Sequence, residues 1–465
     1  MTAVAIPKLD QPRTLKRSMR VVGGLLLTLS GVSPASSVFV AVPDVIGQAG
    51  TGAFLSMFIG AVLAIPIAYV YAELASAFPI AGGEYSMVGR TLGPASGFVM
   101  LGVTVVGNML APALFALGAS DYIADVIPGL DAKALAIAII VAATVSAVLH
   151  IRTNAWVTGI FLLTELAALA VLTGLGFFHI ARPLSEIALH PVMLEGHALH
   201  PASFSAIGLA TAVSLFAYNG YGAACYFAEE MHEAPRVVAR TILLALVITI
   251  VTEFVPVVAV LLAARDLKSF LGSHHPFGDF VRATGGGLLH DIISLSIALA
   301  IINAVLALIL QNARFFYSTG RDNAWHGSVN MLFTITHVRF NSPWFATLVA
   351  GASAIVMCFV RLDLLLVLTG TGIIVTYAGV SLAALAGRWF GTSDHAAYRM
   401  PLFPLMPLLG LFTLGYIVYA SWLDPDAGRP SLFANAAVIV LSLAYYFVFV
   451  RRRGAWILTG PDDAT

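Results

Sequence analysis

Apolar residues run along this 465-residue chain in stretches of about 20 residues, separated by short polar segments. A helix of that length crosses the roughly 30 Å of hydrocarbon in a bilayer, because each helical residue rises about 1.5 Å. No polar segment is long enough for a soluble domain, so we expect an all-α polytopic membrane protein. The pattern predicts twelve transmembrane helices, near residues 21–46, 52–77, 94–119, 132–150, 154–179, 205–229, 239–264, 288–317, 343–361, 363–387, 403–423 and 431–450.

Two of these predicted helices are interrupted near their centres. The first contains "SGVSPAS" from Ser30, and the sixth contains "YNGYG" from Tyr218. An interior glycine costs about 1 kcal/mol against alanine and an interior proline about 3 kcal/mol, and a backbone group freed in lipid finds no water. One such break is explained as well by close helix packing or a kink. The two breaks lie in the first helix of each group of five, helices 1–5 and helices 6–10. This placement predicts a 5+5 inverted repeat with a binding site between discontinuous helices 1 and 6.

The predicted organisation is a single membrane domain over 21–453. Its first repeat covers about 21–180 and its second about 205–387, and helices 11 and 12, at about 403–450, lie outside the repeat. The polar ends, 1–20 and 454–465, are expected to be cytoplasmic tails. With the N-terminus inside, 17 of the 24 lysines and arginines fall on the inner side, which supports this orientation.

Composition narrows the function classes. Hydrophobic residues make up 59% of the chain and charged residues only 10%, against about 25% in ordinary soluble domains. The formal net charge is zero, which argues against a nucleic-acid partner. Cys225 and Cys358 both lie in apolar stretches, so we expect no disulfide. Histidine is scarce inside the predicted helices and no zinc-type pair occurs there, so an enzyme is not expected.

The two breaks suggest a ligand by their electrostatics. The start of a half-helix carries partial positive charge and binds carboxylates, whereas its carbonyl end binds ammonium groups or cations. Pro34, with no N–H to lose, suits the first turn of a restarted helix. We therefore expect the first break to bind the carboxylate of a zwitterionic amino acid and the sixth helix its amine. Neither broken segment contains an acidic residue, which disfavours a polyvalent cation.

Three stretches resemble the amino acid–polyamine–organocation transporter family. They are "YAELASAFPIAGGEYSMVGRTLGPASGF" (Tyr71 to Phe98), "FAEEMHEAPRVVARTI" after the sixth helix, and "ARFFYSTGRDNAWHGSVNMLFTITHVRFNSPWFA" after the eighth. The resemblance implies a leucine-transporter-like fold that moves amino acids or amines by alternating access. The first break is less rich in glycine than is usual in that family, and Asn323 follows Asp322 where the family often has glycine. We therefore place the chain in a side branch.

Side chains near the breaks would select the substrate. The resemblance suggests an aromatic lid at the position of Phe216, although lipid-facing or core packing explains this residue equally well. Asn108 in the third helix is expected to line the same cavity or to pack between helices. The predicted substrate-binding residues are Ser30, Gly31, Val32, Ser33, Pro34, Ala35, Asn108, Phe216, Ala217, Tyr218, Asn219, Gly220 and Tyr221.

Acidic residues inside membrane helices are candidates for ion coupling. Glu165 lies midway along the fifth helix, where the resemblance implies a lysine close to the first break in several relatives. We expect Glu165 to carry the coupling proton; the alternative is a structural hydrogen bond to a facing carbonyl. Glu253 has no evident partner, and we expect Glu73 to pair with a loop or an arginine. Sodium coupling is less favoured, because no facing hydroxyl pair is found in the eighth helix.

The sequence thus predicts a secondary transporter for a neutral amino acid, in a bacterial cytoplasmic membrane. Its partners would be the amino acid, a proton and membrane lipid, with no obligatory protein partner indicated. No cofactor or metal is expected, and His274, His275 and Asp279 are interpreted as an external loop rather than a metal site. An amine or polyamine transporter, an amino acid exchanger and a transporter-like amino acid sensor remain alternatives.

Overall fold

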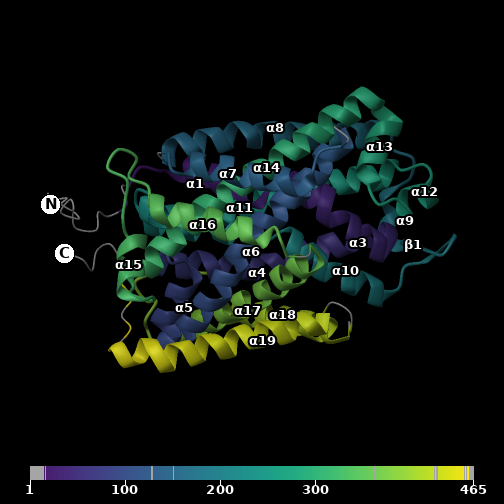
Figure 1. The fold of residues 1–465 in the computed structure, drawn as a ribbon. Coiled ribbons are helices and arrows are strands. Elements are labelled where there is room, and N and C mark those ends of the chain that lie inside the picture. Colours follow the sequence, from purple (N-terminus) through teal and green to yellow (C-terminus); the bar gives the residue numbers. More distant parts are fainter. Residues whose placement is uncertain are drawn as a thin grey trace.

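The computed structural model describes residues 15, 17–126, 129–149, 151–360, 362–423, 425, 428–454, 456, 458 and 459. Almost all of the regular structure in these residues is helical (Figure 1). The first part of the chain forms α1 (Val21–Val32), α2 (Pro34–Ser36), η1 (Ser37–Ala41), α3 (Val42–Ala49), η2 (Gly50–Gly52), α4 (Ala53–Ala77), α5 (Glu84–Leu92), α6 (Pro94–Val126), α7 (Ala132–Ala147) and α8 (Ile151–Phe178).

A short helix and a two-stranded antiparallel hairpin separate this part from the next. The middle of the chain forms α9 (Leu184–Leu189), β1 (Val192–Glu195), β2 (Ala198–Pro201), α10 (Phe204–Ala217), η3 (Tyr221–Glu230), α11 (Ala234–Ala263), α12 (Leu267–Leu271), α13 (Pro276–Gly285) and α14 (Gly287–Arg321). The last part forms α15 (Gly327–Phe333), α16 (Trp344–Met357), α17 (Leu362–Trp389), α18 (Leu405–Leu423), α19 (Gly428–Tyr445), η4 (Tyr446–Val450) and η5 (Arg451–Arg453).

The helices lie where the hydropathy pattern places them. Every one of the twelve predicted stretches overlaps a helix; the first overlaps four helical segments, α1, α2, η1 and α3, and the sixth overlaps two, α10 and η3. Within the described residues, eight helical stretches are long and apolar enough to cross a membrane; one of them, Val21–Ala77, includes the first two predicted helices. The protein is therefore a polytopic all-α membrane protein. The count of twelve and the inverted repeat stay predictions.

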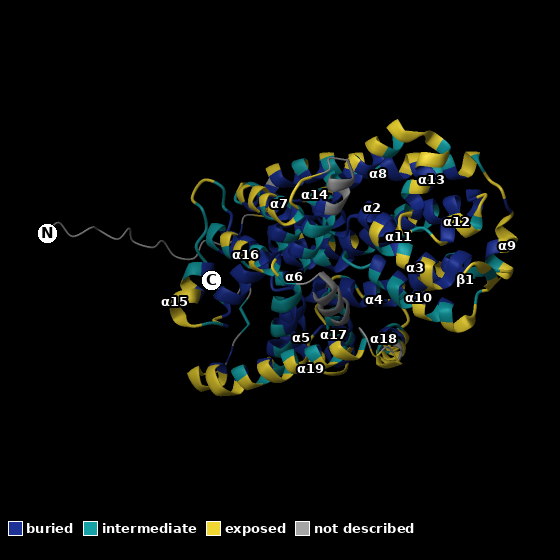
Figure 2. Ribbon diagram, turned by 45° about the vertical axis from the view of Figure 1, so that its right-hand side comes forward, coloured by how far each residue is buried: buried dark blue, intermediate teal, exposed yellow. Residues whose placement is uncertain are grey.

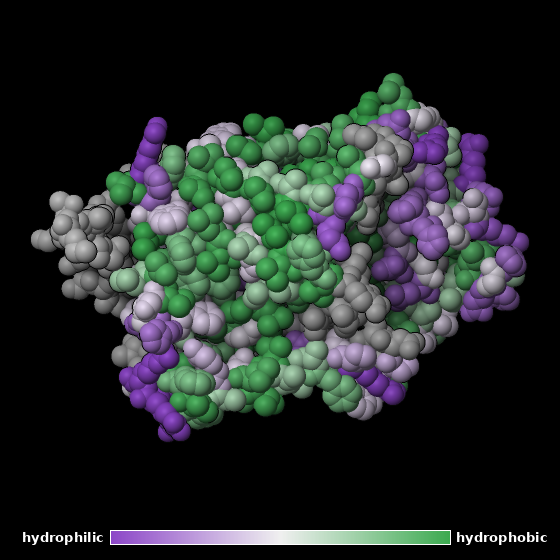
Figure 3. Space-filling model, viewed as in Figure 1, coloured by the Kyte–Doolittle hydropathy of each residue, from purple (hydrophilic) through white to green (hydrophobic). Residues whose placement is uncertain are grey.

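The outer surface of the helices is apolar. Phe204, Phe178 and Phe412 expose 93%, 88% and 78% of their surfaces, which a soluble protein would bury. Figure 3 shows hydrophobic residues over the middle of one face and hydrophilic residues gathered toward its two ends. Exposed positions follow the outer helices, α19 among them, and the buried ones lie inside (Figure 2). This distribution fits a belt of lipid around the helices.

Small residues bring the inner helices close together. At Gly176 of α8, a Cβ atom would lie 2.5 Å from the backbone carbonyl carbon of Ala259 on α11. Such an approach is open only to glycine, and it is a common way of packing helices in membranes. It holds α8 firmly against α11, the two helices that carry Glu165 and Glu253.

Glu73 near the end of α4 is held by an arginine, as the sequence predicted. Arg388 at the end of α17 donates from Nε to Glu73 Oε1 (2.7 Å) and from Nη2 to Oε2 (2.6 Å). The Met400 N–H donates to the same Oε2 (2.7 Å). Because the Glu73 side chain is only 1% exposed, these bonds compensate its desolvation and join α4 to α17.

Replacing Arg388 by alanine should lower the midpoint of thermal unfolding in detergent. Removing one partner of a buried ion pair costs about 3–5 kcal/mol, and we expect the lower end of this range because the Arg388 side chain keeps 17% exposure. Arg399→Ala is the matched control, since Arg399 and Asp394 form an ion pair with side chains 50% and 63% exposed. That pair is worth less than about 1 kcal/mol. Equal shifts in the two variants would contradict this account of Glu73.

Candidate functional site

The first helix is interrupted where the sequence predicted a break. α1 ends at Val32, and Ser33 takes the left-handed backbone conformation, with φ of 50° and ψ of 75°. The Ser33 N–H still donates to the Leu29 carbonyl (2.9 Å), and Pro34 begins the next helical segment. The chain then continues through α2, η1 and α3, so the break opens a second half-helix.

The carboxyl group of Glu165, on α8, lies against the start of this second half-helix. Its Oε1 accepts a hydrogen bond from the Ala35 N–H (2.7 Å) and another from the Ser33 hydroxyl (3.1 Å). The Ser33 and Ser36 hydroxyls are also bonded to each other (2.6 Å). A helix start with unpaired N–H groups stabilises a carboxyl oxygen. Oε2 of Glu165 is buried and has no hydrogen-bond partner among the described residues.

This contact changes the interpretation of the first break. The sequence predicted that its N–H groups would bind a carboxylate brought by the substrate. In the structure a carboxyl of the protein itself bonds the Ala35 N–H. A substrate carboxylate at this place would therefore have to bind beside Glu165 or displace it.

A second contact holds α8 against α1. The Ser30 hydroxyl donates to the Thr158 carbonyl (3.2 Å), and the Asn303 amide of α14 donates to the same carbonyl (3.1 Å). Thr158 precedes Glu165 by about two helical turns. α8 is thus bonded to the first helix on either side of the break, at Ser30 before it and at Ala35 after it.

The sixth predicted helix is also interrupted. α10 ends at Ala217, and Gly220 has a φ of 116° before the chain resumes as the 3₁₀ segment η3. A Cβ atom at Gly220 would lie 2.9 Å from Cγ2 of Val32 and 3.3 Å from its Cα. Both the conformation and the space therefore require glycine here. The backbones of the two breaks pass directly against each other.

A side chain from the restarted first helix bonds the end of α10. The Ser37 hydroxyl donates to the Ala217 carbonyl (3.1 Å). This carbonyl is one of the groups that the sequence predicted would face a substrate amine. Ser37 was not among the predicted residues, and the only signal for it is the serine pair in "PASSV".

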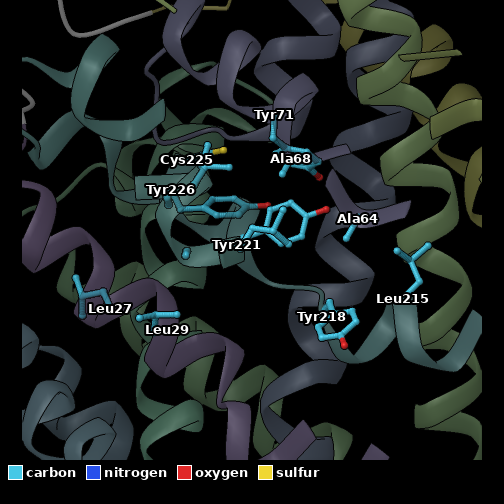
Figure 4. Packing of buried hydrophobic residues seen from close by; sticks show 14 of the residues in the cluster. Leu27, Leu29, Ala64, Ala68, Tyr71, Leu215, Tyr218, Tyr221, Cys225 and Tyr226 are labelled. Atoms are coloured by element: carbon cyan, nitrogen blue, oxygen red, sulfur yellow. The ribbon is translucent and has the colours of Figure 1, made fainter. Parts of the chain in front are cut away.

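The predicted aromatic residues divide into two groups. The Tyr218 hydroxyl donates to the Met57 carbonyl of α4 (3.3 Å), so this side chain is anchored on α4. Tyr221 instead packs its ring against Tyr71 and Tyr377, with centroids 6.2 and 6.5 Å apart. Figure 4 shows Tyr71, Tyr221 and Tyr226 together, with Tyr218 apart from them. The buried Tyr221 hydroxyl lies close to the hydroxyl of Tyr377.

The side-chain amide of Asn219, which lies in a broken membrane helix and needs hydrogen-bond partners, has one such partner. The Tyr377 hydroxyl of α17 donates to its Oδ1. Sequence reasoning did not single out Tyr377 or Asn303. Each is a polar side chain inside an apolar stretch, and that was the only signal available.

The side chains of two predicted residues, Asn108 and Phe216, make no hydrogen bond to the breaks among the described residues. The hydrogen bond that Asn108 makes runs to α14, because its backbone carbonyl accepts from the Asn312 amide. Its own Nδ2 is buried without a partner in the described part of the chain. Phe216 is half-buried, and its backbone carbonyl accepts from the Asn219 N–H (3.0 Å). A lid role for Phe216 stays a prediction.

Glu253 of α11 also lies in this region. Its carboxyl is beside Ser37 and is close enough to Glu165 and Tyr218 for electrostatic interaction. It is wholly buried, and neither oxygen has a hydrogen-bond partner among the described residues. The structure thus places two acidic side chains next to the first break, although neither belongs to a broken segment.

No arrangement of ligands for a metal ion is found in the residues that the structure describes. A group of three or more histidine, cysteine, aspartate or glutamate side chains suited to a metal ion does not occur there, and this includes His274, His275 and Asp279.

Replacing Gly220 by alanine should destabilise the protein. A non-glycine residue in the left-handed region costs roughly 1–2 kcal/mol, and the new Cβ would press on Val32. We expect a lower midpoint of thermal unfolding than for Gly174→Ala, because a Cβ at Gly174 meets nothing within 4 Å. Adding Val32→Ala to Gly220→Ala should restore part of the lost stability, because it removes the Cγ2 atom that the new Cβ would touch. Strictly additive losses would show that the two breaks do not touch.

The chain was compared with known proteins. A family model described as "Amino acid permease" matches residues 21–449. An uncharacterized transporter of Mycobacterium tuberculosis is 27% identical over 94% of this chain and 92% of its own length. The branched-chain amino acid permease BcaP of Bacillus subtilis is 24% identical over 95% of this chain and 94% of its own. The human Asc-type amino acid transporter 1 is 22% identical over 94% of this chain and 83% of its own length.

These findings confirm the resemblance to amino acid–polyamine–organocation transporters that the sequence motifs suggested. The match to the family model begins with α1 and ends in η4, so it includes both broken helices and Glu165. The chain belongs to the amino acid permease family of membrane transport proteins.

Proposed function

We propose that this protein moves a neutral, zwitterionic amino acid across the cytoplasmic membrane of a bacterium by alternating access, driven by a proton gradient. The observation that carries this proposal is the bond from the Ala35 N–H to the Glu165 carboxyl. The family and the names of the relatives, a branched-chain amino acid permease among them, support the amino acid as substrate. Both termini would lie in the cytoplasm, and lipid would contact the apolar outer surface.

The two breaks carry partial charges of opposite sign, which suit the two charged groups of a zwitterion. N–H groups at the start of α2 carry partial positive charge, and carbonyls at the end of α10 carry partial negative charge. Val32 and Gly220 lie in contact, so the two ends are close to each other. In this proposal the substrate carboxylate binds beside Ala35 and its ammonium group beside Ala217. The residues predicted from the sequence around the two breaks would contact it there.

Glu165 would couple proton binding to substrate binding. A substrate carboxylate beside an ionised Glu165 brings two negative charges together; at about 4 Å and an effective dielectric of about 20 they repel by about 4 kcal/mol. A proton on Glu165 removes this repulsion and weakens its hold on the Ala35 N–H. Proton and substrate therefore favour each other's binding, and linkage makes the effect reciprocal.

One proton is enough for useful accumulation. Moving one charge across 100 mV is worth about 2.3 kcal/mol. That free energy corresponds to a concentration ratio of about fifty.

Alternating access needs contacts that form at one end and break when that end opens. Glu229, at the end of η3, accepts from Arg321 Nη1 (2.8 and 2.9 Å) and from the Ala81 N–H (2.9 Å). The adjacent Glu230 accepts from Arg314 Nε (2.9 Å). These bonds join the segment after the second break to α14 and to the loop between α4 and α5. We assign them to the closed state of the cytoplasmic end.

A second candidate function follows from the two carboxyls near the first break. Glu165 and Glu253 together would suit an amine better than a carboxylate, and the broken segments alone did not reveal this. An amine transporter of the same family is therefore the alternative that the structure favours. An exchanger or a sensor would share the same geometry and is separated from a symporter by transport measurements.

The variant Glu165→Gln should lose most of the uptake driven by a proton gradient while it still exchanges internal for external substrate. The reason is that glutamine bonds the break but cannot release a proton. The measurement is uptake of labelled neutral amino acids, beginning with leucine, into proteoliposomes with and without an inward proton gradient. Glu195→Gln, on the exposed hairpin strand β1, is the control and should behave as wild type.

Three outcomes would contradict the proposal in different ways. Uptake that ignores the gradient in wild type and variant alike would indicate an exchanger. Uptake of labelled amines with no uptake of any amino acid would favour the second candidate function. Binding of leucine without any transport would indicate a sensor.

The variant Arg321→Gln should open the cytoplasmic end more often. Cys225 in η3 is a native probe, because it is buried and unpaired. In a Cys358→Ser background, we expect a permeant maleimide to label Cys225 at least about tenfold faster in the variant, since 1.4 kcal/mol taken from the closed state changes the opening equilibrium tenfold. Arg339→Gln, at an exposed position, is the control. Unchanged labelling would exclude the Glu229–Arg321 pair from closure.

A further inference from the structure

Glu253 is a carboxyl at the centre of the molecule that the proposed mechanism leaves unused. It lies midway along α11 with 0% of its surface exposed. The Ser37 hydroxyl lies beside it but donates its proton to the Ala217 carbonyl. Within the part of the chain that the structure describes, the two carboxyl oxygens are thus left without a hydrogen-bond partner. A buried carboxylate without a partner is costly, and the cost is greater in the interior of a membrane protein. The group must therefore carry a proton or hold a cation that the chain does not supply.

Among the described residues, no basic side chain is found in interaction with Glu253. The titratable groups that interact with it are Glu165 of α8 and Tyr218 at the end of α10, one acidic and one phenolic. α1 and α4, which also pack on α11, contain no lysine, arginine or histidine. The acidic residues of η3, Glu229 and Glu230, already have arginine partners.

Glu253 is also placed where the two broken helices meet. It lies beside Ser37, whose hydroxyl bonds the Ala217 carbonyl at the end of α10 (3.1 Å). Glu165 contacts the same half-helix at Ser33 and Ala35. Two carboxyls from neighbouring helices, α8 and α11, thus border one short stretch of the first helix. Any movement of that stretch changes the surroundings of both groups.

We propose that Glu253 is a second proton-binding site of the transporter, one that takes up and releases its proton in each transport cycle. The carboxylate binds a proton from water on one side of the membrane to give the neutral acid, and the acid returns that proton to water on the other side. No other bond is made or broken. The inference rests on the proposed function, in which Glu165 carries the first proton.

The number of protons moved with each substrate tests this directly. In proteoliposomes with a set pH gradient, the membrane voltage at which net flux of labelled leucine is zero gives the number of charges per leucine. We expect Glu253→Gln to move one proton fewer than wild type, and Glu253→Asp to move as many as wild type. Thr249→Val, one turn away and also a buried polar residue of α11, is the control for a structural effect and should leave the number unchanged.

The possible results separate this inference from the proposed function. If wild-type uptake follows the proton gradient and Glu253→Gln moves the same number of protons, Glu253 keeps its proton throughout and only this inference fails. If wild-type uptake ignores the gradient, both fail. If replacing sodium by choline abolishes wild-type uptake and Glu253→Gln loses this dependence, Glu253 holds sodium and the inference is also overturned.

An infrared measurement keeps the inference testable if Glu253→Gln does not fold. Addition of leucine should change the carbonyl band of a protonated carboxyl in the difference spectrum of the wild-type protein. In Glu253→Asp that band should shift, while in Glu165→Gln it should remain. A leucine-induced spectrum that is the same in wild type and Glu253→Asp would show that Glu253 does not exchange its proton.

Discussion

The hydrogen bond between the Ala35 N–H and the Glu165 carboxyl (2.7 Å) is the interaction on which the centre of this molecule depends. A helix that stops and restarts inside a membrane leaves N–H groups that neither lipid nor water can bond. Glu165 bonds one of them, and the Ser33 hydroxyl bonds the same carboxyl oxygen (3.1 Å). The break in the first helix is therefore stable only while α8 stays against it, and the Ser30–Thr158 bond holds α8 there.

The second break depends on the first. Gly220 passes so close to Val32 that no side chain fits between them, and Ser37 bonds the carbonyl at the end of α10. A movement of the first half-helix must therefore be transmitted to the end of α10. Farther along, η3 is joined to α14 by the pairs of Glu229 with Arg321 and Glu230 with Arg314. The breaks and the arginine pairs thus form one connected set of contacts.

The sequence predicted the helices and the breaks well because both follow from local chemistry. Apolar stretches mark helices in a membrane, and Pro34 and Gly220 mark places where a helix cannot continue. It did not predict that Glu165 would bond Ala35, since the two are 130 residues apart and no local pattern encodes that contact. Tyr377 and Asn303 were missed for the same reason. Asn108 was expected either to line the cavity or to pack between helices, and its backbone carbonyl accepts a hydrogen bond from Asn312 of α14.

Whether the side chain at position 165 is basic or acidic decides how a proton could act on the break. A lysine there, as the family resemblance implies for several relatives, can only donate, and so would bond carbonyls at the end of the first half-helix. Glutamate accepts, and in this structure it accepts from the Ala35 N–H and the Ser33 hydroxyl at the start of the second half. Protonation would strengthen the hold of a lysine on the break and weaken that of a glutamate. In this chain a proton on Glu165 would therefore free the Ala35 N–H, the group to which the proposed function assigns the substrate carboxylate.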